Sequence, residues 1–259
     1  MAREQRFISG IFNYCDRWCE RCQYTARCRV YRDTHRMEQR HQRKGQPVGG
    51  LEVALKDVAR SFEKARRLLE RWAKAQNLDL NEMVQAGDEA AHQRAEGDLD
   101  EHPLVREATS YMKACGELIK KLGPVFNKAR DDAKGRAGFM DVGAEAGELA
   151  RVREALEVLS WDYTLICVKV RRAVSGLLGP LAEETGSRDA STSDAAGSAF
   201  VARKCLIRSK AALTRVYEWD PSRGDEVIDL LVTAERLQRG LEGQLPGCID
   251  FCWPPNEEE

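Results

Sequence analysis

The chain has 259 residues, of which 42% are hydrophobic and 32% are charged, and its formal net charge is −1. This length allows one large domain or two small ones whose core needs no disulfides. The apolar runs are too short to span a bilayer, and the opening MAREQRFISGIF lacks the apolar region of a secretory signal. We therefore expect a cytoplasmic protein without a membrane partner.

Charge is unevenly distributed along the chain. Residues 1–44 hold eleven Lys and Arg against five Asp and Glu, whereas the remaining residues hold thirty against thirty-seven. A basic module of this kind can attract nucleic acid or an acidic protein. Its arginines can equally solvate helix faces and offset the negative charge of metal-bound thiolates, so the charge alone leaves both roles open.

Helical periodicity dominates the pattern of apolar residues. The first module, residues 1–44, ends at the helix-breaking GQPVGG of 45–50. Apolar residues then recur in alternating steps of four and three, which predicts a helix with one apolar stripe. The stripe consists of Leu51, Leu55, Val58, Phe62, Ala65, Leu69 and Trp72. A shorter helix is expected near 80–96.

The second half of the chain predicts further long helices with short connections. Pro103 suits the first turn of a helix, and Pro124 predicts a kink later in the same helix. The expected elements are, in chain order, a helix from 103 to about 130, a loop at 131–143, a helix at 145–178, a flexible polar linker at 183–198, helices near 197–218 and 223–242, and an irregular tail at 246–259.

These elements predict an all-α protein. Residues 1–44 form a cysteine-rich metal-binding helical module, residues 51–245 form an antiparallel helical bundle, and 246–259 form the tail. We expect five or six long helices in the bundle.

The most informative motif is YCDRWCERCQYTARC, which holds Cys15, Cys19, Cys22 and Cys28. In a helix, the first three would lie at i, i+4 and i+7 on one face, and Cys28 would return after a turn. Four converging thiolates suit a tetrahedral zinc site or an iron–sulfur cluster. Because all four lie in one short run, as in many iron–sulfur proteins, we favour the cluster. Alternatively, the four cysteines could be buried core residues that bind no metal, but the segment is too polar to form much of a core.

The segment CERCQYTARCRVYR, Cys19 to Arg32, resembles the C-x2-C-x5-C segment of WhiB-like iron–sulfur proteins and of helix-hairpin-helix DNA glycosylases. The resemblance implies that Cys19, Cys22 and Cys28 ligate a [4Fe–4S] cluster. It departs from those families in Gln23, where proline is usual, and in the position of Cys15, which is only four residues before Cys19. The wider stretch FISGIFNYCDRWCERCQYTARC, together with the late AERLQRGLEGQLPG, resembles uncharacterised bacterial helical proteins with an N-terminal cysteine module. This resemblance implies no activity.

Other residues suggest weaker alternatives. Cys248 and Cys252 could add ligands or be incidental thiols, and Trp18 could shield a cluster or anchor the module. Cys115, Cys167 and Cys205 are expected in the core. The Glu-x-x-His pairs of di-iron bundles occur at Glu38/His41 and at Glu89/His92.

The sequence therefore predicts a [4Fe–4S] protein that acts in redox sensing or electron transfer with a protein or redox partner. A second interpretation is a structural zinc module in an interaction protein that binds nucleic acid or a partner protein. A third is a metalloenzyme with its site in the bundle, although the expectation leans away from an enzyme.

Overall fold

The computed structural model describes residues 7–46, 50–80, 98–136, 143–178 and 194–253. The chain divides into two compact units. The first contains residues 1–12 and 17–94, and the second contains 13–16 and 95–259. The short segment 13–16 therefore belongs to the C-terminal unit, although the chain on both sides of it belongs to the N-terminal one.

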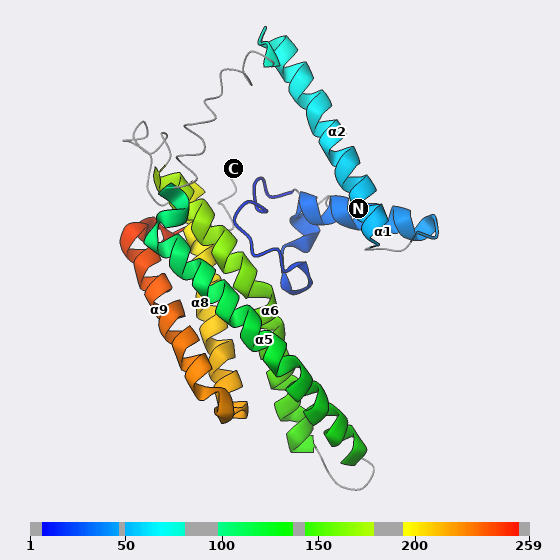
Figure 1. The fold of residues 1–259 in the computed structure, drawn as a ribbon. Coiled ribbons are helices and arrows are strands. Elements are labelled where there is room, and N and C mark those ends of the chain that lie inside the picture. The colour runs from blue at the N-terminus through cyan, green and yellow to red at the C-terminus, as the bar shows by residue number, and fades with distance from the viewer. Residues whose placement is uncertain (1–6, 47–49, 81–97, 137–142, 179–193, 254–259) are drawn as a thin grey trace. The chain divides into compact units, whose positions relative to one another are not determined.

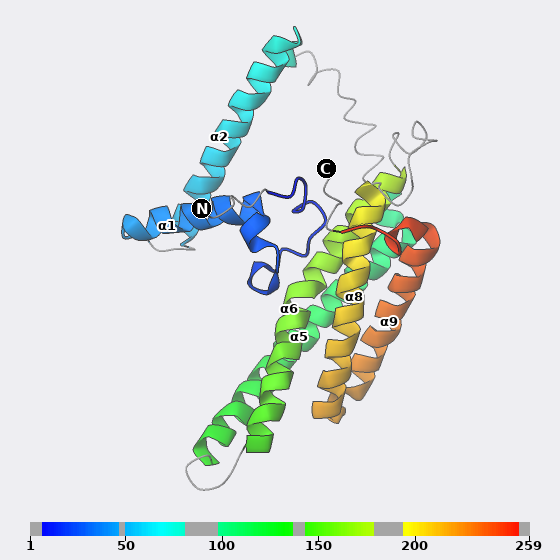
Figure 2. The same ribbon diagram turned by 180° about the vertical axis from the view of Figure 1, so that it is seen from behind.

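The C-terminal unit is an antiparallel helical bundle (Figures 1 and 2). Its helices are α5 (Pro103–Arg136), α6 (Gly143–Leu178), α8 (Asp194–Trp219) and α9 (Gly224–Gln244). In both views, α5 and α6 continue as a hairpin past the end of α8 and α9. That extension has its own small core, in which Phe126 and Trp219 meet edge to face with ring centroids 6.1 Å apart.

The bundle core contains the residues that helical periodicity assigns to one face. Tyr111, Leu159, Ile166 and Leu206 are fully buried, and burying an aliphatic side chain of this size contributes about 1.5–3 kcal/mol. Small residues allow close helix packing: a Cβ on Gly240 would lie 2.5 Å from a Leu104 methyl carbon. The side chain of Leu104 therefore occupies the space that a larger residue at 240 would need.

The N-terminal unit contains two short 3₁₀ turns, η1 (Cys19–Arg21) and η2 (Thr25–Arg27), followed by α1 (Arg29–Arg43) and α2 (Leu51–Ala75). Ile8, Ile11 and Trp18 are its buried apolar residues in the cysteine module. The Ile8 N–H donates to the Arg27 carbonyl oxygen at 3.1 Å, which joins the segment of Ile8 to η2.

The structure confirms the all-α class and the antiparallel packing for the residues that it describes. It changes several predicted boundaries. α5 continues through Pro124 to Arg136 because its buried face continues to Ala133, so the predicted loop at 131–143 begins too early. Likewise α8 begins at Asp194, inside the predicted linker, because residues 195–199 are buried. The predicted helix near 80–96 lies almost wholly outside the described residues.

The tail is less irregular than expected, because η5 (Pro246–Cys248) follows α9 and buries Cys248. The helix α2 groups with the N-terminal unit, and α5, α6, α8 and α9 belong to the bundle. None of the helices in the described ranges is long and apolar enough to cross a membrane.

Candidate functional site: the cysteine module

The cysteine segment folds as two tight turns, and the continuous helix considered for Cys15, Cys19 and Cys22 is wrong. In η1 the Cys22 N–H donates to the Cys19 carbonyl oxygen at 3.1 Å, and in η2 the Cys28 N–H donates to the Thr25 carbonyl oxygen at 3.2 Å. Both cysteines then take an extended backbone conformation, which ends each turn. A 3₁₀ turn spaces its residues differently from an α-helix, so the argument from one helical face does not apply.

Two of the cysteine sulfurs accept backbone hydrogen bonds. Cys22 Sγ accepts from the Tyr24 N–H at 3.4 Å, and Cys28 Sγ accepts from the Tyr31 N–H at 3.5 Å. Cys28 is also the N-cap of α1, where the partial positive charge of a helix N-terminus favours an anionic group. Each of these two sulfurs therefore has a backbone N–H donor, as ligating sulfurs in metal sites commonly do.

The module also places cations over its aromatic rings. The Arg21 guanidinium lies 4.0 Å from the centroid of the Trp18 ring, and that of Arg32 lies 4.0 Å from the centroid of the Phe7 ring. Trp18 is only 9% exposed. Contacts of this kind contribute about 0.5–1 kcal/mol at exposed sites, and they keep two arginines beside the cysteine turns.

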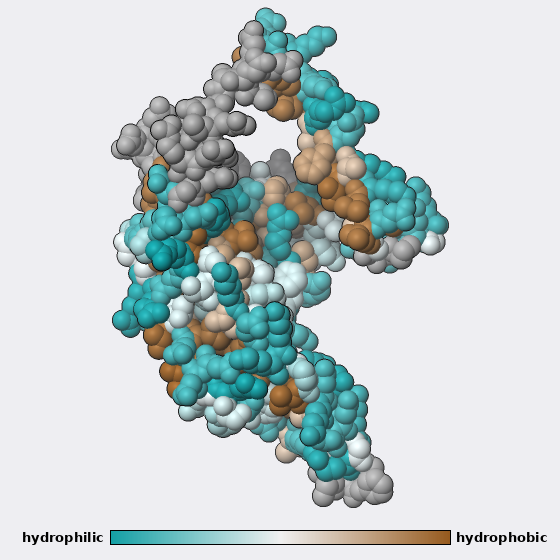
Figure 3. All heavy atoms as spheres, viewed as in Figure 1, coloured by the Kyte–Doolittle hydropathy of each residue, from teal (hydrophilic) through white to brown (hydrophobic). Residues whose placement is uncertain are grey.

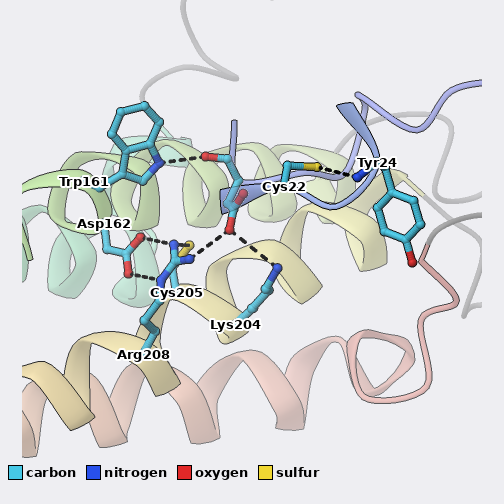
Figure 4. Close-up of polar contacts among 8 residues, drawn as sticks. Cys22, Tyr24, Trp161, Asp162, Lys204, Cys205 and Arg208 are labelled. Atoms are coloured by element: carbon cyan, nitrogen blue, oxygen red, sulfur yellow. Dashed lines mark hydrogen bonds and ion pairs between the residues drawn. The ribbon is translucent and has the colours of Figure 1, made fainter. Parts of the chain in front are cut away.

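Cys15 lies in the segment 13–16, which belongs to the bundle unit. Figure 4 shows Trp161, Lys204 and Arg208, the side chains of the bundle that contact this segment. The Asp16 carboxylate accepts from Arg208 Nη1 at 2.9 Å and lies 3.5 Å from Lys204 Nζ. Trp161 Nε1 donates to the Asp16 backbone carbonyl at 2.8 Å. Side chains of α6 and α8 therefore hold the residue next to Cys15 from both sides.

Tyr14 provides a second attachment of this segment. Its ring fills the space left by Gly197 on α8, where an added Cβ would lie 2.4 Å from a ring carbon. The ring meets Phe251 edge to face at 4.9 Å between centroids, and the hydroxyl donates to Asp194 Oδ1 at 3.2 Å. Burial and the Asp194 carboxylate raise the pKa of the Tyr14 hydroxyl.

Arg208, which binds Asp16, also forms a buried ion pair with Asp162 that the sequence did not reveal. Asp162 is fully buried on α6 and accepts two hydrogen bonds from Arg208, at 2.5 and 2.9 Å. Ser209 Oγ donates to the same carboxylate at 3.5 Å. Burial raises the pKa of the Asp162 carboxyl, although the Arg208 guanidinium opposes that rise. The available signal was an acidic residue three positions after Leu159 and four before Ile166, on the apolar face of a long helix.

The remaining candidate groups are not brought together. Glu38 lies 3.5 Å from His35, whereas His41 binds Asp57 Oδ2 at 2.6 Å, so Glu38 and His41 have different neighbours. Glu89 and His92 lie outside the described residues. Cys248 is buried and Cys252 is exposed; Cys115 and Cys205 are in the core as expected, and Cys167 is half-buried.

Two of the cysteine sulfurs have hydrogen-bond donors, but the described residues form no closed metal site. Within the parts of the chain that are described, no three His, Cys, Asp or Glu side chains gather in an arrangement that could hold a metal ion. Cys19, Cys22 and Cys28 are half-buried residues of the N-terminal unit, and Cys15 is a half-buried residue of the bundle unit.

Comparison with known proteins adds no family assignment. No family model, no curated protein and no solved structure matches this chain. The resemblance of Cys19–Arg32 to iron–sulfur segments therefore stays a prediction from the sequence.

Proposed function

We propose that the N-terminal module is a metal-binding module in which Cys19, Cys22 and Cys28 ligate a [4Fe–4S] cluster. The observation that carries the proposal is that two backbone N–H groups donate hydrogen bonds to Cys22 Sγ and Cys28 Sγ. Hydrogen bonds to ligating sulfurs stabilise their charge and adjust the reduction potential of a cluster. A bound cluster would supply one-electron chemistry, and we therefore propose a role in redox sensing or electron transfer.

The chain's own residues would contribute in three ways. The turns η1 and η2 would present the cysteines to the cluster, and the start of α1 would favour a negatively charged ligand at Cys28. Arg21, Arg27 and Arg29 offset the negative charge of the thiolates. Cys15 stays a predicted fourth ligand, to be tested separately because it belongs to the bundle unit.

The proposal is tested by anaerobic purification of the full chain, iron, sulfide and zinc analysis, and a visible spectrum. We expect about four irons and four sulfides per chain and an absorbance near 400 nm that bleaches on reduction. Cys22→Ser and Cys28→Ser should each lose the iron. Cys167→Ser is the matched control, because it removes a half-buried thiol of the bundle, and it should keep the iron.

The same experiment distinguishes the alternatives. One zinc per chain and no colour would contradict the cluster and favour the structural zinc module, since N–H donation suits zinc-bound thiolates as well. A steep fall of nucleic-acid affinity with salt would then support an interaction role for the basic N-terminus. Iron that persists in Cys19→Ser would favour a carboxylate site in the bundle, and a chain without metal would contradict the proposal.

A further inference from the structure

The helix α2 has almost no buried residues, although its stripe is apolar. Of its 25 residues only Ala73 is buried. Leu51 is 77% exposed, Phe62 72% and Trp72 50%, and Figure 3 shows brown, apolar side chains along this helix. Helices in proteins take most of their stability from packing of an apolar face. Among the described residues, the apolar face of this helix, which is about 37 Å long, is exposed. We therefore expect a partner to cover it.

The spacing of the stripe specifies the kind of partner. Steps of four and three repeat without interruption along the stripe, which we name the α2 seam and which consists of Leu51, Leu55, Val58, Phe62, Ala65, Leu69 and Trp72. This is a repeat of 3.5 residues over three heptads, with a positions at 55, 62 and 69. A narrow seam of that period is the pattern of a helix that packs along another helix in a coiled coil.

The positions beside the α2 seam are mostly small or uncharged. They are, at heptad positions e and g, Glu52, Ala54, Ala59, Ser61, Arg66, Leu68, Ala73 and Ala75. The two charged members already have partners within α2: Glu52 binds Lys56 at 2.7 Å, and Arg66 binds Glu63 at 3.0 Å. No row of like charges therefore keeps two copies of this helix apart, as e and g charges do in helices that avoid self-pairing.

Charge along α2 favours an antiparallel pair. Residues 51–62 carry two acidic and two basic side chains, whereas 63–75 carry two acidic and five basic ones. A parallel pair would bring the two basic halves together, and an antiparallel pair places each basic half against a neutral half. Antiparallel packing also pairs Phe62 with Ala65 of the second copy, so that the largest side chain at the centre meets the smallest.

A cleft beside the centre of the seam has room for an aromatic ring. It has a volume of about 590 Å³ and lies between α1 and α2, with Met37 on one side and Val58, Phe62 and Ala65 on the other. His41 of α1 binds Asp57 of α2 at 2.6 Å and so holds the two helices beside the cleft.

We propose that the α2 seam binds a second copy of this chain, with the two α2 helices antiparallel and Phe62 of each copy seated in the α1–α2 cleft of the other. Such a contact is isologous, because the same surface serves both copies and closes at two chains. The proposal is independent of the metal, since it uses none of the cysteines.

Sedimentation equilibrium of the full chain tests it over a wide range of concentration. We expect a dimer, and we expect Phe62→Glu to raise its dissociation constant by about 100-fold or more, because each substitution acts twice at the centre of the interface. Val168→Glu is the matched control: it places the same charge on a residue of α6 that is 60% exposed, and the dimer should persist. Phe62→Ala, with the bundle's helicity checked by circular dichroism, separates loss of the contact from misfolding.

The remaining outcomes are equally decisive. A parent chain that is monomeric at every concentration would overturn the proposal, as would a dimer that Phe62→Glu and Phe62→Ala leave intact. Salt tests the direction: an antiparallel pair should show little dependence on ionic strength, whereas a dimer that tightens steeply with salt would indicate facing basic halves and overturn the antiparallel arrangement. Cys19→Ser should leave the dimer unchanged, and Phe62→Glu should leave the metal content unchanged.

Discussion

Replacement of Arg208 by Met tests the anchor that holds the segment of Cys15 to the bundle. Arg208 binds the fully buried Asp162 through two hydrogen bonds and Asp16 through a third. Removing one partner of a buried ion pair costs about 3–5 kcal/mol, because a desolvated charge is left without compensation. Domains of this kind have a free energy of unfolding of about 5–15 kcal/mol, so we expect Arg208→Met to remove a large part of it at neutral pH.

The loss should depend on pH through the Asp162 carboxyl. Burial raises its pKa above the unfolded value of about 3.9. A carboxyl whose pKa is higher in the folded chain than in the unfolded chain binds its proton more tightly when the chain is folded. The free energy of unfolding therefore falls as pH rises from the unfolded pKa through the folded pKa, and the carboxyl stabilises the fold least above the folded pKa. Without Arg208 the pKa rises further. The free energy of unfolding of the variant should therefore be closest to that of the parent at about pH 4, and the difference should be largest at about pH 7.5.

The assay is urea unfolding followed by far-ultraviolet circular dichroism at both pH values. Asp162→Asn removes the buried charge, so Arg208→Met should cost much less in that background. Arg236→Met is the control, since it removes an exposed arginine that binds Glu107 at 2.6 Å, and it should change stability little. A loss below about 1 kcal/mol at neutral pH, or one of equal size at both pH values and in the Asp162→Asn background, would refute the reasoning.

Two further predictions concern the same bundle. Gly197→Ala should destabilise the bundle by about 1–3 kcal/mol in urea unfolding, because the added Cβ meets Tyr14 at 2.4 Å and Phe251 at 2.7 Å; unchanged stability would show that both rings can move away at no cost. Burial raises the pKa of the Cys115 thiol to about 12 and also raises that of Cys205, so a thiol reagent at about pH 8 should label both only after unfolding, and rapid labelling in the folded chain would contradict their burial.

The site could be predicted only in part from the sequence. Cysteine spacing identified the module, because four thiols in fifteen residues is a local pattern. The same spacing could not distinguish a helix from a pair of 3₁₀ turns, because both are compatible with it. The turns are closed by backbone hydrogen bonds such as that from the Cys22 N–H to the Cys19 carbonyl oxygen. Hydrogen bonds to the sulfurs of Cys22 and Cys28 depend on that backbone conformation and were not foreseeable.

The helices themselves were determined by the sequence, because apolar periodicity is a property of each segment alone. The stripes of α5, α6 and α9 became buried faces, and those helices formed close to where the periodicity placed them. The stripe of α2 is at least as regular, yet it is exposed. Periodicity states that a face is apolar and not what covers it.

Only the tertiary structure decided which distant residues meet. Arg208 lies 46 positions from Asp162 and 192 from Asp16, and no local pattern relates the three. Their contact arises because α6 and α8 pack side by side and because small residues at the start of α8 leave room for Tyr14. A helix is encoded by neighbours in the chain, whereas an ion pair across a bundle depends on how whole helices pack, and that is settled only when the core is formed.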